Sequence, residues 1–214
     1  MKIYNNRMQS KRIDIAISFK KNLAEEISKQ SSNLAKISEP YFILDSKNFY
    51  PHISIYSIEI PQKNLSKIFN SIEETISTVK PFKLKFNGYE IRDGYVVLFC
   101  DKSLELKKLH RKILDEINPL RDNLIRDKYK DQSVMDKLTA KEKKYAIEYG
   151  YPGVLDLYRP HLTLIRYIKD IEIDKVLYVL NSKWKLTEIE VNAITVFEMQ
   201  SSGTCVKILK DFIL

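Results

Sequence analysis

Apolar residues along the first third of the chain switch between two spacings. In residues 12–19 they recur at every second position, which is the pattern of a half-buried strand. In residues 21–37 and 63–79 they recur three and four positions apart, which predicts amphipathic helices. Between these helices, residues 52–60 are rich in isoleucine and are closed by a proline, so we expect a second strand there.

The same order of elements occurs again in the second half. Each half is expected to contain a helix, a histidine-bearing strand, a second helix and two closing strands. The first closing pair turns at Asp93-Gly94, a common hairpin sequence. Residues 119–138 fit a loop, a lid or a helix. The other elements expected in the second half are a helix at 103–118, a helix capped by Thr139 and Glu142, a strand at 161–168 and a helix at 172–181, followed by two strands.

This repetition predicts a single α+β domain over residues 1–214. We expect a bilobal, duplicated fold with a pseudo-twofold axis. One lobe takes its motif from about 12–100 and the other from about 101–214, with strand exchange between the lobes allowed. Each lobe would hold an antiparallel sheet flanked by helices, and the symmetry would bring both histidine strands to one central cleft.

Two of the three histidines occur in nearly the same phrase. PHISIY begins at residue 51 and PHLTLIRY at residue 160, so each histidine follows a proline and precedes a hydroxyl residue by two positions. Residues two apart in a strand point to one face, which pairs His52 with Ser54 and His161 with Thr163. The third histidine, His110, lies in an amphipathic helix and is interpreted as structural or solvated.

Two such units suit the cleavage of a phosphodiester without a metal. In-line displacement at phosphorus needs a base on one side and an acid on the other, and imidazoles titrate close to neutral pH. Hydroxyl groups can donate hydrogen bonds to the phosphate oxygens. The cysteines, Cys100 and Cys205, make no metal spacing with each other or with the histidines, and we interpret them as buried, reduced thiols. We expect no metal and no cofactor.

The formal net charge of +8 changes the picture in one respect, because it favours an anionic partner such as a nucleotide or RNA. Scattered, solvated lysines explain the same charge without any ligand. The sequence shows neither an apolar run long enough to span a bilayer nor a secretory signal. We therefore expect a cytoplasmic monomer that does not associate with membranes.

The paired motifs, HISI at 52–55 and HLTL at 161–164, resemble those of the two-histidine (2H) phosphoesterase superfamily. That superfamily includes the RNA 2′,3′-cyclic phosphodiesterases first described as 2′-5′ RNA ligases. Arg166, five residues after the second histidine, adds to the resemblance. The approach EYGYPGVLDLYRPHLTL is also similar to small 2H relatives linked to bacterial phosphonate metabolism, which would shift the substrate from RNA toward a small cyclic ribose phosphate.

The resemblance implies metal-free hydrolysis of a 2′,3′-cyclic phosphate on an RNA end or a nucleotide. One histidine activates water and the other protonates the departing ribose oxygen; we provisionally make His161 the base and His52 the acid. Ser54 and Thr163 complete the catalytic set. Five further residues are candidates for substrate binding. Strict alternation along the strand turns one of them, Arg166, away from His161 unless the strand contains a bulge. The five candidates are Arg166, Tyr56, Tyr167, Tyr41 and Arg159.

Other functions stay open at this point. A hydrolase of the same fold could act on 2′-5′ oligoadenylate, on a cyclic dinucleotide or on a small cyclic ribose phosphate, or could trim RNA 3′ ends. A binding module could hold a nucleotide or RNA without cleaving it, although such a module need not keep both an acid and a base. A scaffold with incidental histidines is the third alternative.

Overall fold

The computed structural model describes residues 9–183 and 185–214. The expected α+β fold is confirmed. Within these residues, no helix combines the length and the apolar character that are needed to cross a bilayer. The strands are β1 (Ser10–Ile17), β2 (Pro40–Ile43), β3 (Ile53–Pro61), β4 (Phe82–Arg92), β5 (Tyr95–Cys100), β6 (His161–Tyr167), β7 (Glu188–Val191), β8 (Ala193–Met199) and β9 (Cys205–Ile213). The helices are α1 (Lys21–Leu34), α2 (Leu65–Ile76), α3 (Leu104–Ile117), α4 (Gln132–Asp136), α5 (Ala140–Tyr149) and α6 (Ile173–Lys183).

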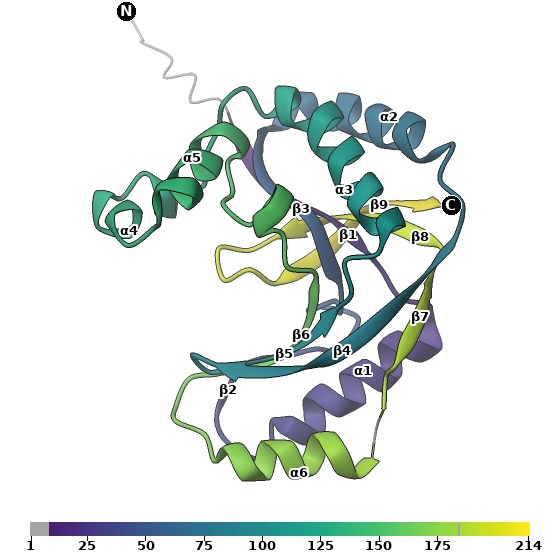
Figure 1. Cartoon of the computed structure of the whole chain (residues 1–214), viewed down its shortest axis with the longest axis vertical. Coiled ribbons are helices and arrows are strands. Elements are labelled where there is room, and N and C mark those ends of the chain that lie inside the picture. The colour runs from purple at the N-terminus through teal and green to yellow at the C-terminus, as the bar shows by residue number, and fades with distance from the viewer. Residues whose placement is uncertain (1–8, 184) are drawn as a thin grey trace, which may run out of the picture.

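The strands form one curled antiparallel sheet in the order β7-β4-β5-β6-β3-β1-β8-β9, with β2 added to β6 (Figure 1). The two sheets expected from the sequence are the two halves of this sheet. They join through a single residue pair, Ile53 of β3 and Leu162 of β6. Strands are exchanged between the sequence halves, because β4 and β5 extend β6 while β8 and β9 extend β1.

Helices cover the outer faces of both halves and leave the inner faces for a cleft. α3 packs against β3 and α2, whereas α1 packs against β6 and α6 (Figure 1). The core is dominated by isoleucine, and α2 illustrates the pattern, since Ile68, Ile72 and Ile76 are buried along one stripe. Apolar burial on the helix-covered faces therefore holds the two halves of the sheet in shape.

Residues 119–138 contain 3-10 turns and the short helix α4 and are tied to α5. The buried guanidinium of Arg121 donates to the carbonyl groups of Ile147 and Glu148, both at 2.7 Å, and also to that of Leu124. α5 itself begins with the expected capping box and ends at a glycine in the left-handed conformation.

The predicted hairpin at Asp93-Gly94 joins β4 and β5. Gly94 has φ of +78°, and a Cβ at this position would lie 2.7 Å from the carbonyl oxygen of Tyr167. The turn therefore requires glycine, because β6 passes close behind it.

Candidate active site

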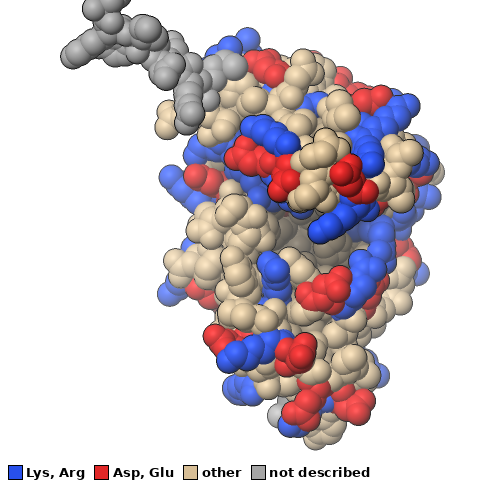
Figure 2. Space-filling view, turned by 90° about the vertical axis from the view of Figure 1, so that its left-hand side faces the viewer, with Lys and Arg blue, Asp and Glu red and all other residues tan. Residues whose placement is uncertain are grey.

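The two histidine strands meet at the centre of the sheet. Ile53 pairs with Leu162 in an antiparallel ladder. His52 therefore lies opposite Thr163, and Ser54 lies opposite His161. All four of these side chains line one cleft of about 660 Å³. Figure 2 shows the hollow, with basic and acidic groups on its border. The four predicted catalytic residues are thus brought together where the two halves of the sheet meet, next to the pair Ile53 and Leu162.

Both imidazoles are held in the same way. His52 Nδ1 lies 2.8 Å from the carbonyl oxygen of Tyr50, and His161 Nδ1 lies 2.7 Å from that of Arg159. A carbonyl oxygen only accepts, so Nδ1 carries the proton in each ring. Nε2 is then left in both rings to take or to give a proton in the cleft.

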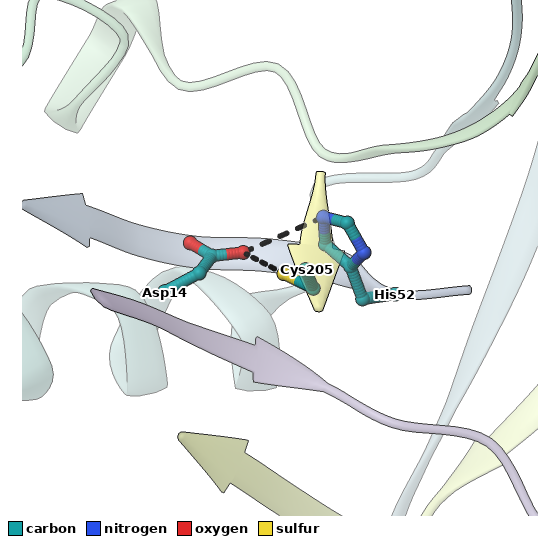
Figure 3. Close-up of side chains that lie close together, drawn as sticks. All are labelled: Asp14, His52 and Cys205. Atoms are coloured by element: carbon teal, nitrogen blue, oxygen red, sulfur yellow. Dashed lines mark hydrogen bonds and ion pairs between the residues drawn. The ribbon is translucent and has the colours of Figure 1, made fainter. Parts of the chain in front are cut away.

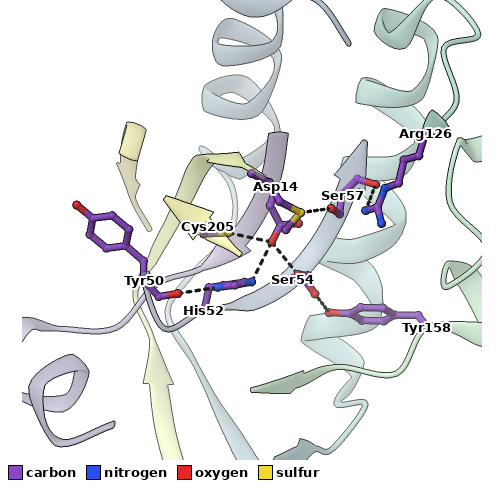
Figure 4. Close-up of polar contacts among 9 residues, drawn as sticks. Asp14, Tyr50, His52, Ser54, Ser57, Arg126, Tyr158 and Cys205 are labelled. Carbon is purple, nitrogen blue, oxygen red and sulfur yellow. Dashed lines mark hydrogen bonds and ion pairs between the residues drawn. The ribbon is translucent and has the colours of Figure 1, made fainter. Parts of the chain in front are cut away.

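The surroundings of His52 are anionic. Its Nε2 lies 3.6 Å from Oδ2 of Asp14, a β1 residue with no exposed surface. Ser54 Oγ donates to the same carboxylate oxygen at 2.7 Å, as Figure 4 shows. Burial raises the pKa of Asp14, while the charge of His52 and the Ser54 hydroxyl act in the opposite direction. Asp14 thus places an acidic group beside the His52 nitrogen that is left free in the cleft.

The surroundings of His161 are different. Burial lowers the pKa of His161. The hydrogen bond to the Arg159 carbonyl and the more distant Asp14 act against this, whereas the positive charges of His52 and Arg159 add to it. The ring of Phe99 lies 5.6 Å away, centroid to centroid. Among the described residues, no carboxylate lies within 4.0 Å of the His161 nitrogens. The neutral form of His161 is therefore favoured.

A β-bulge falls on the last residue of each motif, three residues after its histidine. Opposite β1, β3 carries Ile55 as an extra residue, and opposite β5, β6 carries Leu164 as an extra residue. Each bulge resets the alternation of side chains. Ser57 therefore returns to the cleft face, which it lines. Arg166 pairs with Tyr95 and returns to the face of Thr163, but it lies outside the lining of the cleft.

The predictions for Tyr56 and Tyr167 as substrate-binding residues are wrong. Because the bulges intervene, both side chains turn to the helix-covered side and are buried. Tyr56 Oη donates to the carbonyl of Tyr149 at 2.7 Å, and Tyr167 Oη donates to that of Leu34 at 2.7 Å. These phenols connect the sheet to its helices.

The other three candidates lie at or near the cleft. Arg159 lines it, pairs with Glu90 at 2.8 Å and stacks on Phe99. The guanidinium of Arg166 lies 4.9 Å from the ring centres of both Tyr41 and Tyr95. Of these two rings, that of Tyr95 lines the cleft, whereas Tyr41 is half exposed and lies outside the lining.

The sequence shows no metal-ligand spacing near either motif, but the fold assembles three ligand types beside His52. The side-chain ligand atoms of Asp14, His52 and Cys205 lie within 4.8 Å of one another, from three separate strands or strand ends (Figure 3). Carboxylate, imidazole and thiolate suit a borderline-soft cation such as Zn²⁺. His52 was expected from its motif, and Asp14 had a weaker sequence signal as a charged residue on the non-isoleucine face of the strand at 12–19, whereas nothing in the sequence placed Cys205 beside them.

His110 is structural, one of the two interpretations that its helical context allowed. It is buried in α3; its Nδ1 donates to the carbonyl of Ile55 at 2.9 Å, and its Nε2 accepts from the backbone N–H of Leu155 at 2.9 Å. The ring stacks on Tyr158 at 4.0 Å, and the Tyr158 hydroxyl donates to the carbonyl of Ser54. His110 thus fixes the bulge of the first motif from behind.

Comparison with known proteins agrees with this geometry. A family model described as the 2′-5′ RNA ligase superfamily matches residues 25–203, whereas no curated protein gives a significant match. TT0787 of Thermus thermophilus is a similar solved structure, with a TM-score of 0.57 and 13% identity over 95% of this chain and 97% of that one. So is E. coli LigT complexed with 3′-AMP, with a TM-score of 0.53 and 13% identity over 96% and 99%. Identities this low speak for the fold alone, but the family model covers most of the sequence, and the chain belongs to the 2′-5′ RNA ligase superfamily of two-histidine phosphoesterases.

Proposed function

We propose that the protein hydrolyses a 2′,3′-cyclic phosphate, on a nucleotide or an RNA end, with His161 as the base and His52 as the acid. Membership of the superfamily implies a phosphoesterase or ligase-like activity. The observation that carries the finer proposal is the pair of imidazoles in one cleft, each with Nδ1 on a carbonyl and Nε2 available. Their unlike surroundings suit one neutral and one protonated ring at the same pH.

The reaction would proceed by in-line displacement. Neutral His161 takes a proton from water through Nε2 while the water oxygen bonds to phosphorus. The bond from phosphorus to one ribose oxygen breaks, and that oxygen receives the proton from Nε2 of His52. His161 then carries the added proton and His52 has lost one, so exchange with solvent restores the starting state.

The two hydroxyl groups would have different hydrogen-bond partners during the reaction. Ser54 donates to Asp14, which directs its proton to the carboxylate rather than to a phosphate oxygen. Thr163 lines the cleft and is the hydroxyl we assign to a non-bridging oxygen. The positive side chain of Arg159 lines the cleft beside His161 and would offset the charge of the phosphate. Arg166 lies behind the lining residue Tyr95 and would add to this charge from outside the lining.

The test is hydrolysis of a panel of 2′,3′-cyclic nucleotides and short RNAs with 2′,3′-cyclic ends, with EDTA present. We expect wild-type turnover in EDTA, and a loss of kcat of about 10² to 10⁴ in His52→Ala and in His161→Ala. The double variant should be little worse than the poorer single variant, because the two groups act as a unit. Wild-type kcat in either folded variant would overturn the assignment, and binding without turnover would favour a binding module.

A further inference from the structure

Three cationic side chains line the same cleft beyond the first histidine motif. They are Arg12 of β1, Arg126 just before the turn at Asp127–Tyr129, and Lys128 within that turn. Arg126 is 6% exposed, donates from Nη2 to the carbonyl of Ser57 at 2.9 Å (Figure 4), and stacks over Tyr151 at 4.4 Å. The cluster therefore adjoins the strand that carries the first motif.

Two of these guanidinium groups have a buried donor with no partner. Nε of Arg12 and Nε of Arg126 are both buried and make no hydrogen bond. Arg12 is held in place by other contacts, because its Nη1 donates to the carbonyls of Gln200 and Ser201 at 2.9 and 3.0 Å. Buried donors are rarely left unpaired in proteins, and an ordered water or a ligand in the cleft supplies the partner that the protein does not.

The three positive charges also lie close enough to oppose one another. Partial burial and the charges of Arg126 and Arg12 lower the pKa of Lys128 to about 8. Burial, followed by the charge of Arg126, lowers the pKa of Arg12.

Acidic groups are near but do not neutralise the cluster. Glu59 and Asp14 both act on Arg12, but Asp14 is engaged by His52 and Ser54, and burial raises the pKa of Glu59. Across the described parts of the chain, none of the three cations forms an ion pair within 4.0 Å. Like charges gathered in a partly desolvated cleft are stabilised by an anion.

We propose that Arg12, Arg126 and Lys128 form a subsite for a second phosphate, carried by the same small substrate as the cyclic phosphate. The inference rests on the proposed function and narrows its substrate to a cyclic phosphodiester that also bears a phosphate monoester. Ser54 and Ser57 lie opposite Ala16 and Asp14 of β1, because Ile55 is the extra residue of the bulge. They are therefore two strand positions apart, or roughly 7 Å, which places the second phosphate about one nucleotide from the first. Guanidinium groups bind phosphate through paired hydrogen bonds, and a dianion offsets the clustered charge best.

The test compares three substrates: adenosine 2′,3′-cyclic phosphate, the same compound with a 5′-phosphate, and a dinucleotide that ends in a 2′,3′-cyclic phosphate. We expect kcat/KM to be at least about tenfold higher for the 5′-phosphorylated nucleotide than for the other two. Lys128→Gln and Arg12→Gln should each lower the ratio of kcat/KM for the 5′-phosphorylated nucleotide to that for the unphosphorylated one about tenfold. Lys130→Gln is the matched control, since Lys130 is an exposed lysine of the same segment and pairs with Asp127 at 2.6 Å; its ratio should equal that of the wild type.

Binding to the folded His161→Ala variant separates the possible failures. If that variant binds the 5′-phosphorylated nucleotide at least about tenfold more tightly than the unphosphorylated one, and adding Lys128→Gln removes the preference, the subsite stands even without turnover. Equal kcat/KM for both mononucleotides overturns the subsite and leaves the proposed function intact. A higher kcat/KM for the dinucleotide than for the 5′-phosphorylated nucleotide overturns the proposal of a phosphate monoester. The cationic cluster would then bind the next phosphodiester of an RNA.

Discussion

At the scale of single residues, one buried carboxylate distinguishes the two histidines. Asp14 lies 3.6 Å from Nε2 of His52 and accepts a hydrogen bond from Ser54. His161 has an aromatic ring and a cation as its neighbours instead. Two residues of one type in a symmetric position thus receive opposite tasks from their surroundings.

Replacing Asp14 with Asn tests this division. The amide keeps the size of the side chain but removes the acidic group next to Nε2 of His52, so the alkaline limb of the rate profile should move to lower pH. The acid limb, assigned to His161, should move much less. Asp211→Asn is the control, since Asp211 accepts from Thr195 on the neighbouring strand pair. An unchanged alkaline limb in a folded Asp14→Asn protein would contradict the role of this carboxylate.

The ligand set at Asp14, His52 and Cys205 predicts inhibition by zinc. Zn²⁺ bound there would occupy Nε2 of His52 and remove the proposed acid. We expect full activity in EDTA, loss of activity in micromolar Zn²⁺ and recovery on chelation. Cys205→Ser should weaken the inhibition at least about tenfold because serine is a poor zinc ligand. Activation by Zn²⁺ after EDTA treatment would contradict the metal-free mechanism.

At the scale of elements, the two bulges decide which side chains reach the cleft. The sequence predicts most strands, the long helices and the two motifs, because their patterns are local. It does not predict β2, and it does not separate β7 from β8. It does not predict Ile55 and Leu164 as extra residues, since a bulge is a relation between a strand and its neighbour. Tyr56 was misplaced for this reason. Asp14 became part of the site only through pairing of β1 with β3.

The contact of α3 with the bulge of β3 makes stability depend on pH. Burial lowers the pKa of His110 to about 4, below the value of about 6.5 in an unfolded chain. Between these values the unfolded chain binds more protons, so stability falls as the pH is lowered from about 6.5 to 4. The loss should reach about 3 kcal/mol at pH 4.

Urea unfolding of wild type and His110→Gln at pH 7 and pH 4 measures this effect. Glutamine can donate and accept but does not titrate, so the variant should lose about 3 kcal/mol less than the wild type over this range. Equal losses in both proteins would show that His110 does not remain neutral in the folded state.

At the scale of the whole molecule, the pseudo-twofold arrangement explains why both motifs meet. Exchange of strands between the sequence halves makes each half of the sheet depend on both halves of the chain. The halves then touch through the pair Ile53 and Leu162, next to the histidines. The duplication places the groups, and the asymmetric neighbours Asp14 and Arg159 differentiate them.

The pH dependence of kcat/KM in wild type and in both single histidine variants tests the central claim most directly. With a 2′,3′-cyclic nucleotide and EDTA, the wild type should give a bell, because His161 must be neutral and His52 protonated. The residual activity of His161→Ala should lose the acid limb, and that of His52→Ala should lose the alkaline limb. A wild-type rate that rises steadily to high pH, or variants that both keep the full bell, would contradict two-histidine catalysis in this cleft.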